Sequence, residues 1–306
     1  MHDVAFVVNP ASGNGRTRRR WPRLERRFSR ILSTRFDVHM TERPGHGTDL
    51  AREAIEDGAT TIVSVGGDGT LNEIVNGYLR PDGRRLNPAA RIAVFSVGTG
   101  SDFVKTTRFP TDPDAVARRI ATGETRAIDA GRCACAGPAG PIERHFINIA
   151  EFGSGGAVVD RVNHTTKVLG GRMSFFLAIL RTMPRYRNTR VSYEADGGPR
   201  SEVMMNDFIV ANGRFFGGGL MPAPDADVAD GALDVVIVGD LDFRTIRKHL
   251  PRMRAGTHLD LPGIAHLRCR ELAVHSNEEM IDLDGEYVGR TPTRFEVVPG
   301  AVRVVV

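Results

Sequence analysis

Three apolar segments that each run directly into a glycine-rich polar turn constrain the fold of this chain more than any other feature. The segments are Val4–Val8, Thr60–Val65 and Ile92–Phe95, and their continuous apolar or β-branched character is typical of strands buried on both faces. Such strands belong to parallel sheets, whose strands end at a shared edge. Open α/β sheets bind ligands at that edge, so we expect the three turns to lie together at a binding site.

Helical patterns separate the strands. Trp21, Leu24 and Phe28 follow the first turn at helical spacing, and Leu71, Ile74, Val75 and Leu79 follow the second. A further strand and helix lie between them, and Asp112 followed by Pro113 is a typical helix start. The alternation predicts a β-α-β series with right-handed crossovers over residues 1–127.

The pattern changes near Arg126. Short alternating segments separated by glycine, proline and aspartate follow one another to the end of the chain, which predicts an antiparallel β-sandwich domain over residues 128–306. Two helices interrupt it, Gly171–Met183 and a second that begins at Asp242, whereas we interpret Gly153–Gly156 as a loop. The fold class is therefore α/β, with an N-terminal parallel-sheet nucleotide-binding domain before the sandwich. The cleft between two such domains is the expected place for a second substrate.

The turn after the second strand has the composition of a phosphate site. Gly66, Gly67 and Gly69 allow backbone N–H groups to approach an anion closely, and the helix that follows adds a favourable dipole. Asp68 is an acid in this setting, and one reason to place a carboxylate beside phosphates is a metal ion that bridges them. The alternative is a tight strand-to-helix turn with an exposed aspartate.

Charge and cysteine content indicate the cellular setting. There are 41 basic and 37 acidic residues, a net charge of +4, which suits anionic partners without singling out nucleic acid. Eight arginines between residues 16 and 30 are either a solvated helix face or a flank for phosphates or an anionic bilayer. Three cysteines, no signal pattern at the N-terminus and no apolar run near ~20 residues predict a soluble cytoplasmic protein with, at most, peripheral membrane contact.

Two acidic stretches lie in the second half. Asp225, Asp227, Asp230 and Asp234 are close enough in sequence to require either solvation or a cation. Asp284 and Glu286 are two residues apart, which on an extended segment places both on one side. Because Asp-Gly is a common turn, an acidic hairpin tip is the alternative for that pair.

Five motifs in order resemble one family. They are Asn9–Gly13, Gly66–Glu73, Gly98–Phe103, Ala223–Asp234 and Leu283–Glu286. Together they look like the bacterial diacylglycerol kinase and YegS-type lipid kinases, whose catalytic domain is shared by sphingosine and ceramide kinases. The resemblance implies a nucleotide domain like those of NAD kinase and diacylglycerol kinase. It also implies Mg²⁺-dependent transfer of the ATP γ-phosphate to a lipid hydroxyl, with diacylglycerol converted to phosphatidic acid.

The resemblance assigns roles residue by residue. Glu286 matches the proton acceptor, with Asp284 in the same turn and Asp68 as the competing base. Asp230 would bind a structural Mg²⁺ through its carboxylate, and Asp227 and Ala232 through their backbone carbonyls. The positions that match nucleotide contacts are Asn9, Ser12, Gly13, Thr41, Gly66, Gly67, Asp68, Gly69, Thr70, Asn72 and Thr99.

One departure from the family leaves alternatives open. Ser101 stands where the family has asparagine, and the shorter side chain loses a contact or replaces it with water. A non-catalytic nucleotide- or lipid-binding regulator on the same fold is one alternative. A kinase of a soluble substrate, such as NAD kinase with its similar Gly-Gly-Asp-Gly turn, is another. The expected partners are a lipid alcohol, an anionic membrane surface and a second copy of the chain.

Overall fold

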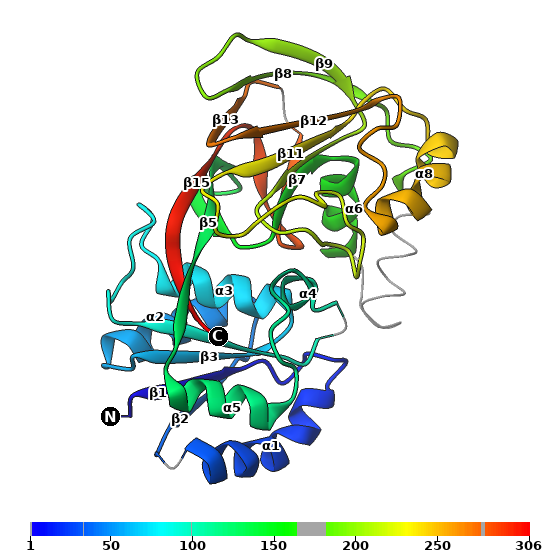
Figure 1. Cartoon of the computed structure of the whole chain (residues 1–306). Coiled ribbons are helices and arrows are strands. Elements are labelled where there is room, and N and C mark those ends of the chain that lie inside the picture. The colour runs from blue at the N-terminus through cyan, green and yellow to red at the C-terminus, as the bar shows by residue number, and fades with distance from the viewer. Residues whose placement is uncertain (1, 33, 99, 164–181, 277–278) are drawn as a thin grey trace. The chain divides into compact units, whose positions relative to one another are not determined.

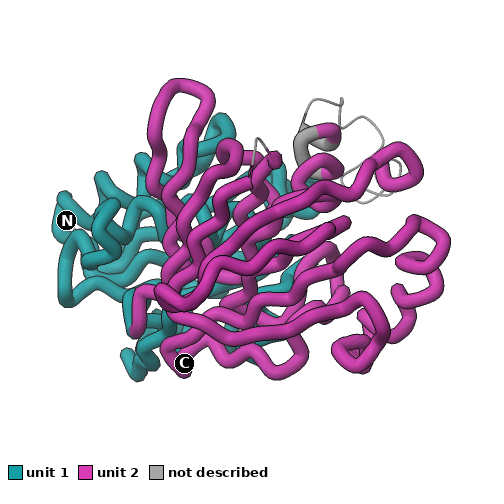
Figure 2. Tube along the Cα trace, turned by 90° about the horizontal axis from the view of Figure 1, so that it is seen from above, with its two compact units in different colours: residues 1–129, 300–306 teal, residues 130–299 magenta. Residues whose placement is uncertain are grey.

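A computed structural model describes residues 2–32, 34–98, 100–163, 182–276 and 279–306 (Figure 1). The chain divides into two compact units, which Figure 2 shows in different colours. Unit 1 comprises the residues up to Asp129 together with Gly300–Val306, and unit 2 comprises Ala130–Pro299.

Unit 1 contains the predicted parallel sheet, in the order β2-β1-β3-β4 with parallel pairing throughout. Alternate side chains of β1 pack on the helix that follows it, and the rings of Phe6 and Phe28 lie 4.8 Å apart. Helices α1 and α5 cover this face, and α2 and α3 cover the other (Figure 1). The elements are β1 (Val4–Val8), α1 (Arg16–Leu32), β2 (Asp37–Met40), α2 (His46–Glu56), β3 (Thr61–Gly66), α3 (Asp68–Tyr78), β4 (Arg91–Ser96), α4 (Asp102–Thr107), α5 (Pro113–Thr122) and the start of β5 (Thr125–Gly137).

The C-terminal strand contributes to unit 1 as well. Strand β15 (Glu286–Val305) is 20 residues long. Its C-terminal end pairs in parallel with β4, with Val304 opposite Ile92. The predicted second domain extends to residue 306, whereas unit 2 ends at Pro299. The apolar residues at the end of β15 are buried beside the first sheet, with Val302 and Val304 inaccessible to solvent.

Unit 2 is built on antiparallel strands, as the sequence predicts, in the order β12-β11-β10-β7-β14-β15. Its core lies on one face of these strands, where the rings of Phe152 and Phe208 stack 4.7 Å apart. The elements are β6 (Gly140–Phe146), β7 (Ile149–Gly153), α6 (Ser154–Asn163), β8 (Thr189–Ala195), β9 (Ser201–Met205), β10 (Asp207–Ala211), β11 (Leu233–Val238), α8 (Phe243–Ala255), β12 (Ile264–Cys269), β13 (Glu271–Val274) and β14 (Met280–Leu283).

Local predictions in unit 2 have mixed outcomes. The helix start at Asp242 is confirmed, since its carboxylate accepts the Thr245 N–H at 2.9 Å. The interpretation of Gly153–Gly156 as a loop is wrong, because α6 begins at Ser154. Glycine is required there for packing: a Cβ on Gly156 would lie 2.0 Å from the Met280 carbonyl oxygen. The predicted helix Gly171–Met183 lies almost wholly outside the described residues.

None of the helices in the described ranges combines the length and the apolar character that a bilayer crossing requires.

Candidate functional site

The three glycine-rich turns of unit 1 meet at one edge of the parallel sheet. A Cβ on Gly13, after β1, would lie 2.9 Å from the carbonyl oxygen of Val97, after β4. A Cβ on Gly98 would lie 2.7 Å from the Cα of Gly67, after β3. The backbones approach this closely only because these positions carry no side chain, so the turns form one surface rich in backbone N–H groups.

Side chains of the predicted nucleotide positions hold the turns together. Asn9 donates from Nδ2 to Thr70 Oγ1 at 3.0 Å and accepts the Ala11 N–H at 3.0 Å, which joins the first turn to α3. Ser12 donates to the Asn9 carbonyl oxygen at 2.8 Å and lies 2.6 Å from the hydroxyl of Thr17. Because Gly66 has no Cβ, the Thr70 side chain can fold back onto the strand end. The residues at the strand ends thus fix the shape of the turns.

Of two further predicted nucleotide positions, the structure describes one, Thr41. Thr41 continues β2, is buried, and donates its N–H to the Val8 carbonyl oxygen at 2.9 Å. Thr99 lies outside the described residues. Ser101, the departure from the family, has φ +55°, and its hydroxyl lies 2.6 Å from that of Ser96. Asparagine tolerates this left-handed conformation better than most residues, which explains a preference for it at this position.

Asp68 caps a helix from another turn. Its two carboxylate oxygens accept the N–H groups of Asp102 and Phe103, each at 3.1 Å, at the start of α4. Burial raises the pKa of the Asp68 carboxyl, although these two hydrogen bonds and the nearby Lys105 oppose the shift. The carboxylate therefore stabilises the third turn, and each oxygen keeps a second lone pair for another partner.

Sequence reasoning missed the equivalent role of Glu73. Its buried carboxylate accepts the N–H groups of Gly45 at 2.8 Å and Gly47 at 2.7 Å, at the start of α2. A Cβ on Gly47 would lie 2.6 Å from a Glu73 oxygen. The glycine pair just after the second strand is the signal that could have revealed this contact. Both acids of α3 thus fasten a neighbouring helix to the site.

Replacing Gly98 by alanine is expected to destabilise unit 1 by about 1–3 kcal/mol, because two backbone segments must separate to admit the methyl group. The displaced turn should also raise KM for ATP, which steady-state kinetics would measure alongside urea denaturation. Gly67→Ala is the control for stability, since its Cβ would make only an ordinary 3.7 Å contact with Gly98. Equal stability of Gly98→Ala and the unchanged protein would contradict the close approach of the turns.

The carboxylate of Asp284, in unit 2, serves as a structural anchor. It accepts three backbone N–H groups, from Ile147 at 2.8 Å, Asn148 at 3.0 Å and Ile149 at 2.9 Å. Asp284 occupies the left-handed region at φ +51°, in the tight turn between β14 and β15. The hairpin tip that we considered as an alternative is therefore the geometry of this segment, and Asp284 ties it to the β6–β7 connection.

Glu286 differs from Asp284 in its surroundings. It begins β15 opposite Leu283, and its side chain is about one-third exposed. An Oε2 atom lies 3.7 Å from an Arg144 guanidinium nitrogen, a distance that allows attraction but no hydrogen bond. Both acids of the turn are partly exposed, but the Asp284 carboxylate is bound by three backbone N–H groups, whereas the 3.7 Å contact of Glu286 with Arg144 is a loose one.

Acids of the run Asp225–Asp234, which leads into β11, form hydrogen bonds and an ion pair with other groups of the chain. Asp227 accepts the Ala229 N–H at 3.1 Å, and Asp230 accepts the Ala232 N–H at 3.1 Å. The second oxygen of Asp230 pairs with Arg268. Within the described ranges, no three His, Cys, Asp or Glu side chains are grouped so that they could hold a metal ion. The Mg²⁺ site at Asp227, Asp230 and Ala232 stays a prediction.

Sequence reasoning also missed a group of acids buried within strands. Glu151 on β7 lies opposite Asp282 on β14, and the two carboxyls share a hydrogen bond. Burial raises the pKa of both carboxyls well above the usual range, and the negative charge of neighbouring acids raises each pKa further. Burial also raises the pKa of Asp207, on β10, to about 7. An acid inside an otherwise apolar strand is the signal for such a position.

We expect the unchanged protein to lose stability as the pH rises from about 5 to about 8, because Asp207 ionises in a half-buried position. Asp207→Asn should lose less stability over the same range. The pKa of Asp207 is about 7 in the folded protein and about 4 in the unfolded chain. Its contribution to the free energy of unfolding is therefore fully present below about pH 4 and is lost as the pH rises through about 7. The difference is on the order of a few kcal/mol, and thermal denaturation at the two pH values measures it. Exposed Asp225→Asn removes the same charge and should keep the original pH dependence.

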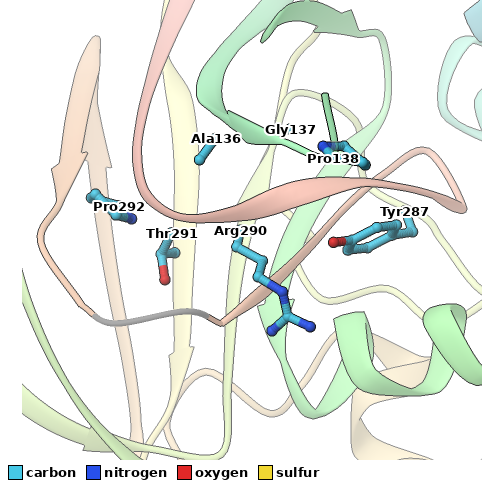
Figure 3. Close-up of a pocket in the computed structure, with 7 residues that line it drawn as sticks. All are labelled: Ala136, Gly137, Pro138, Tyr287, Arg290, Thr291 and Pro292. Atoms are coloured by element: carbon cyan, nitrogen blue, oxygen red, sulfur yellow. The ribbon is translucent and has the colours of Figure 1, made fainter. Parts of the chain in front are cut away.

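One pocket of unit 2 is lined by none of the predicted site residues, although Tyr287, the neighbour of Glu286 in sequence, lines it. It has a volume of about 430 Å³ (Figure 3). Its lining combines the Tyr287 ring and the Arg290 guanidinium with small and proline residues, namely Ala136, Gly137, Pro138, Thr291 and Pro292. Because it contains none of the acids or glycine turns described above, we do not assign it to the phosphoryl-transfer site.

Comparison with known proteins identifies the family. Residues 3–133 match the diacylglycerol kinase catalytic domain, and residues 149–306 match the YegS C-terminal NAD kinase beta sandwich-like domain. The chain belongs to the diacylglycerol kinase family. This is a family of lipid kinases, and kinase membership implies use of ATP.

Relatives of the family match over nearly the whole chain. A diacylglycerol kinase of Bacillus subtilis is 28% identical over 298 residues, which cover 96% of this chain and 93% of the relative. A crystal structure of a Bacillus anthracis diacylglycerol kinase covers 99% of this chain and 97% of its own, with a TM-score of 0.70 and 20% identity. The crystal structure of an NAD kinase from Archaeoglobus fulgidus covers 99% of this chain and 93% of its own. Its TM-score of 0.54, at 15% identity, shows a shared fold.

Proposed function

We propose that this protein is an ATP- and Mg²⁺-dependent lipid kinase that converts diacylglycerol to phosphatidic acid. The observation that carries the proposal is the match of residues 3–133 to the diacylglycerol kinase catalytic domain, together with relatives named diacylglycerol kinase over nearly the whole chain. The converging glycine turns support it, because phosphoryl transfer depends mainly on positioning and on neutralising phosphate charge.

In this proposal the turns bind the nucleotide phosphates through backbone N–H groups. Bound Mg²⁺ would neutralise charge on the phosphates, and Asp68 fits beside it because each carboxylate oxygen retains a lone pair. Glu286 would accept the proton of the lipid hydroxyl while the hydroxyl oxygen bonds to the γ-phosphorus and the bond to ADP breaks. A positioned general base of this kind contributes about 10²- to 10⁴-fold in rate.

The arginines of α1 support contact with an anionic membrane surface, where such a substrate resides. Arg27 pairs with Asp112 and Asp114 of the same unit. Among the residues that the structure describes, no ion pair engages the other seven, which are Arg16, Arg18, Arg19, Arg20, Arg23, Arg26 and Arg30. Each basic residue held near an anionic bilayer contributes about 1 kcal/mol. The cytoplasmic location and the second copy of the chain remain predictions.

A labelling assay tests the function. Purified protein is incubated with γ-³²P-ATP and a panel of lipid alcohols in mixed micelles, with and without Mg²⁺. We expect chloroform-extractable label with diacylglycerol, and only when Mg²⁺ is present. Label that stays in the aqueous phase with NAD would support the soluble-substrate alternative. ATP binding without transfer to any alcohol would support the non-catalytic regulator.

A further inference from the structure

The most deeply buried acid of the acidic run contacts two side chains of the neighbouring strand, a histidine and an arginine. Asp234 is 1% exposed and lies directly opposite Arg268 in the antiparallel pairing of β11 with β12. One Asp234 oxygen lies 2.9 Å from His266 Nε2, and the other lies 3.6 Å from Arg268 Nε. Because strand register sets these pairs, they follow from the fold of the sheet.

Arg268 also reaches the loop that precedes β11. Its terminal Nη2 nitrogen pairs with one oxygen of Asp230, while its Nε faces Asp234. A guanidinium offers donors in a fixed planar fork, so one side chain can neutralise two carboxylates at once. The Arg268 guanidinium thereby joins the acidic loop to the sheet through two carboxylates.

This arrangement does not fit a structural Mg²⁺ at the predicted position. Asp230 supplies the only carboxylate of the predicted ligand set, and its oxygens accept the Ala232 N–H and the Arg268 guanidinium. A divalent ion bound to the same carboxylate would lie within a few ångströms of a positive guanidinium, where like charges repel. The remaining predicted ligands, the carbonyls of Asp227 and Ala232, carry no formal charge.

We propose that Arg268 takes the place of a divalent cation in this loop. Residues 225–234 are then ordered by Arg268 and His266, and the folding of unit 2 needs no metal ion. The proposal is independent of the lipid kinase activity, because its consequence is measured in folding stability and in metal binding by the protein without nucleotide.

Thermal unfolding with EDTA and with millimolar MgCl₂, in the absence of nucleotide, tests the proposal. We expect the unchanged protein to have the same Tm in both solutions. Arg268→Gln removes the cation that faces the buried Asp234 as well as the one that pairs with the more exposed Asp230, so its Tm in EDTA should fall by about 3–8 °C, mainly through Asp234. Mg²⁺ should recover part of that loss, because the carboxylates are then available to it.

Matched variants separate this effect from loss of an arginine in general. Arg294→Gln removes an arginine of the same unit that pairs with Glu271 at 2.6 Å on the surface, and we expect little change in its Tm. Arg268→Lys keeps the charge but not the planar fork, so it should retain part of the stability even if Arg268→Gln does not fold. Calorimetric titration of MgCl₂ into the unchanged protein should detect no binding tighter than millimolar.

Two results would overturn the proposal. One is a Tm of the unchanged protein that drops by several degrees in EDTA and returns with Mg²⁺. The other is an Arg268→Gln variant that is no less stable in EDTA than Arg294→Gln.

Discussion

Glu286→Gln is expected to lower kcat for phosphate transfer to diacylglycerol by about 10²- to 10⁴-fold, because glutamine cannot accept the proton of the attacking hydroxyl. The substitution is nearly isosteric, and the side chain is about one-third exposed with a loose 3.7 Å ion pair to Arg144. We therefore expect Tm to change by no more than a degree or two and ATP binding to persist. Single-turnover assays with γ-³²P-ATP measure the chemical step directly.

Asp284→Asn is the informative comparison, since it lies two residues away and also removes one charge. Three backbone N–H groups bind the Asp284 carboxylate, and an amide would turn an NH₂ toward at least one of them. This variant should lose stability by about 1–3 kcal/mol, through the donor left unpaired. Full activity of Glu286→Gln would exclude Glu286 as the proton acceptor.

Asp68→Ala is expected to have the second-largest effect, with losses in both stability and activity. Removal of the carboxylate leaves the N–H groups of Asp102 and Phe103 without their acceptor, at a cost of about 1–2 kcal/mol. If Asp68 also positions Mg²⁺ at the phosphates, kcat should fall by about 10²-fold or more. The concentration of Mg²⁺ needed for half-maximal activity should then rise.

Glu73→Gln distinguishes the two roles of Asp68. Glu73 lies on the same helix and likewise accepts two backbone N–H groups, but it caps α2 and has no predicted contact with the metal. Urea denaturation should show destabilisation in both variants, smaller in Glu73→Gln because the amide keeps one acceptor oxygen. Only Asp68→Ala should change the Mg²⁺ requirement. If both variants need the same Mg²⁺ concentration as the unchanged protein, Asp68 acts only as a helix cap.

Contacts within a few residues could be predicted because their physical signals are local. Continuous apolar runs predicted β1, β3 and β4, since only strands covered on both faces can bury such runs. The helix starts at Asp112 and Asp242 were predicted because the carboxylate accepts an N–H three residues further on. The parallel sheet predicted that the three glycine turns share one edge, although the residues that meet there, such as Gly67 and Gly98, could not be inferred.

Contacts across the chain required the tertiary structure. Asp68 binds N–H groups 34 and 35 residues away, and Asp284 binds N–H groups more than 130 residues away. The last residues of β15 join the first sheet, although their composition suits either unit. Arg268 meets the acidic loop only because β11 and β12 pair in one register.

The sequence by itself determined the elements, the parallel and antiparallel character of the two halves, and the glycine turns, because these follow from burial patterns and backbone freedom over short stretches. Only the tertiary structure decided what the acids of the candidate site, such as Asp68 and Asp284, bind. A buried carboxylate pairs with the N–H groups or cations that the folded chain places next to it. Those groups can be far away in sequence, so spacing along the chain does not predict them.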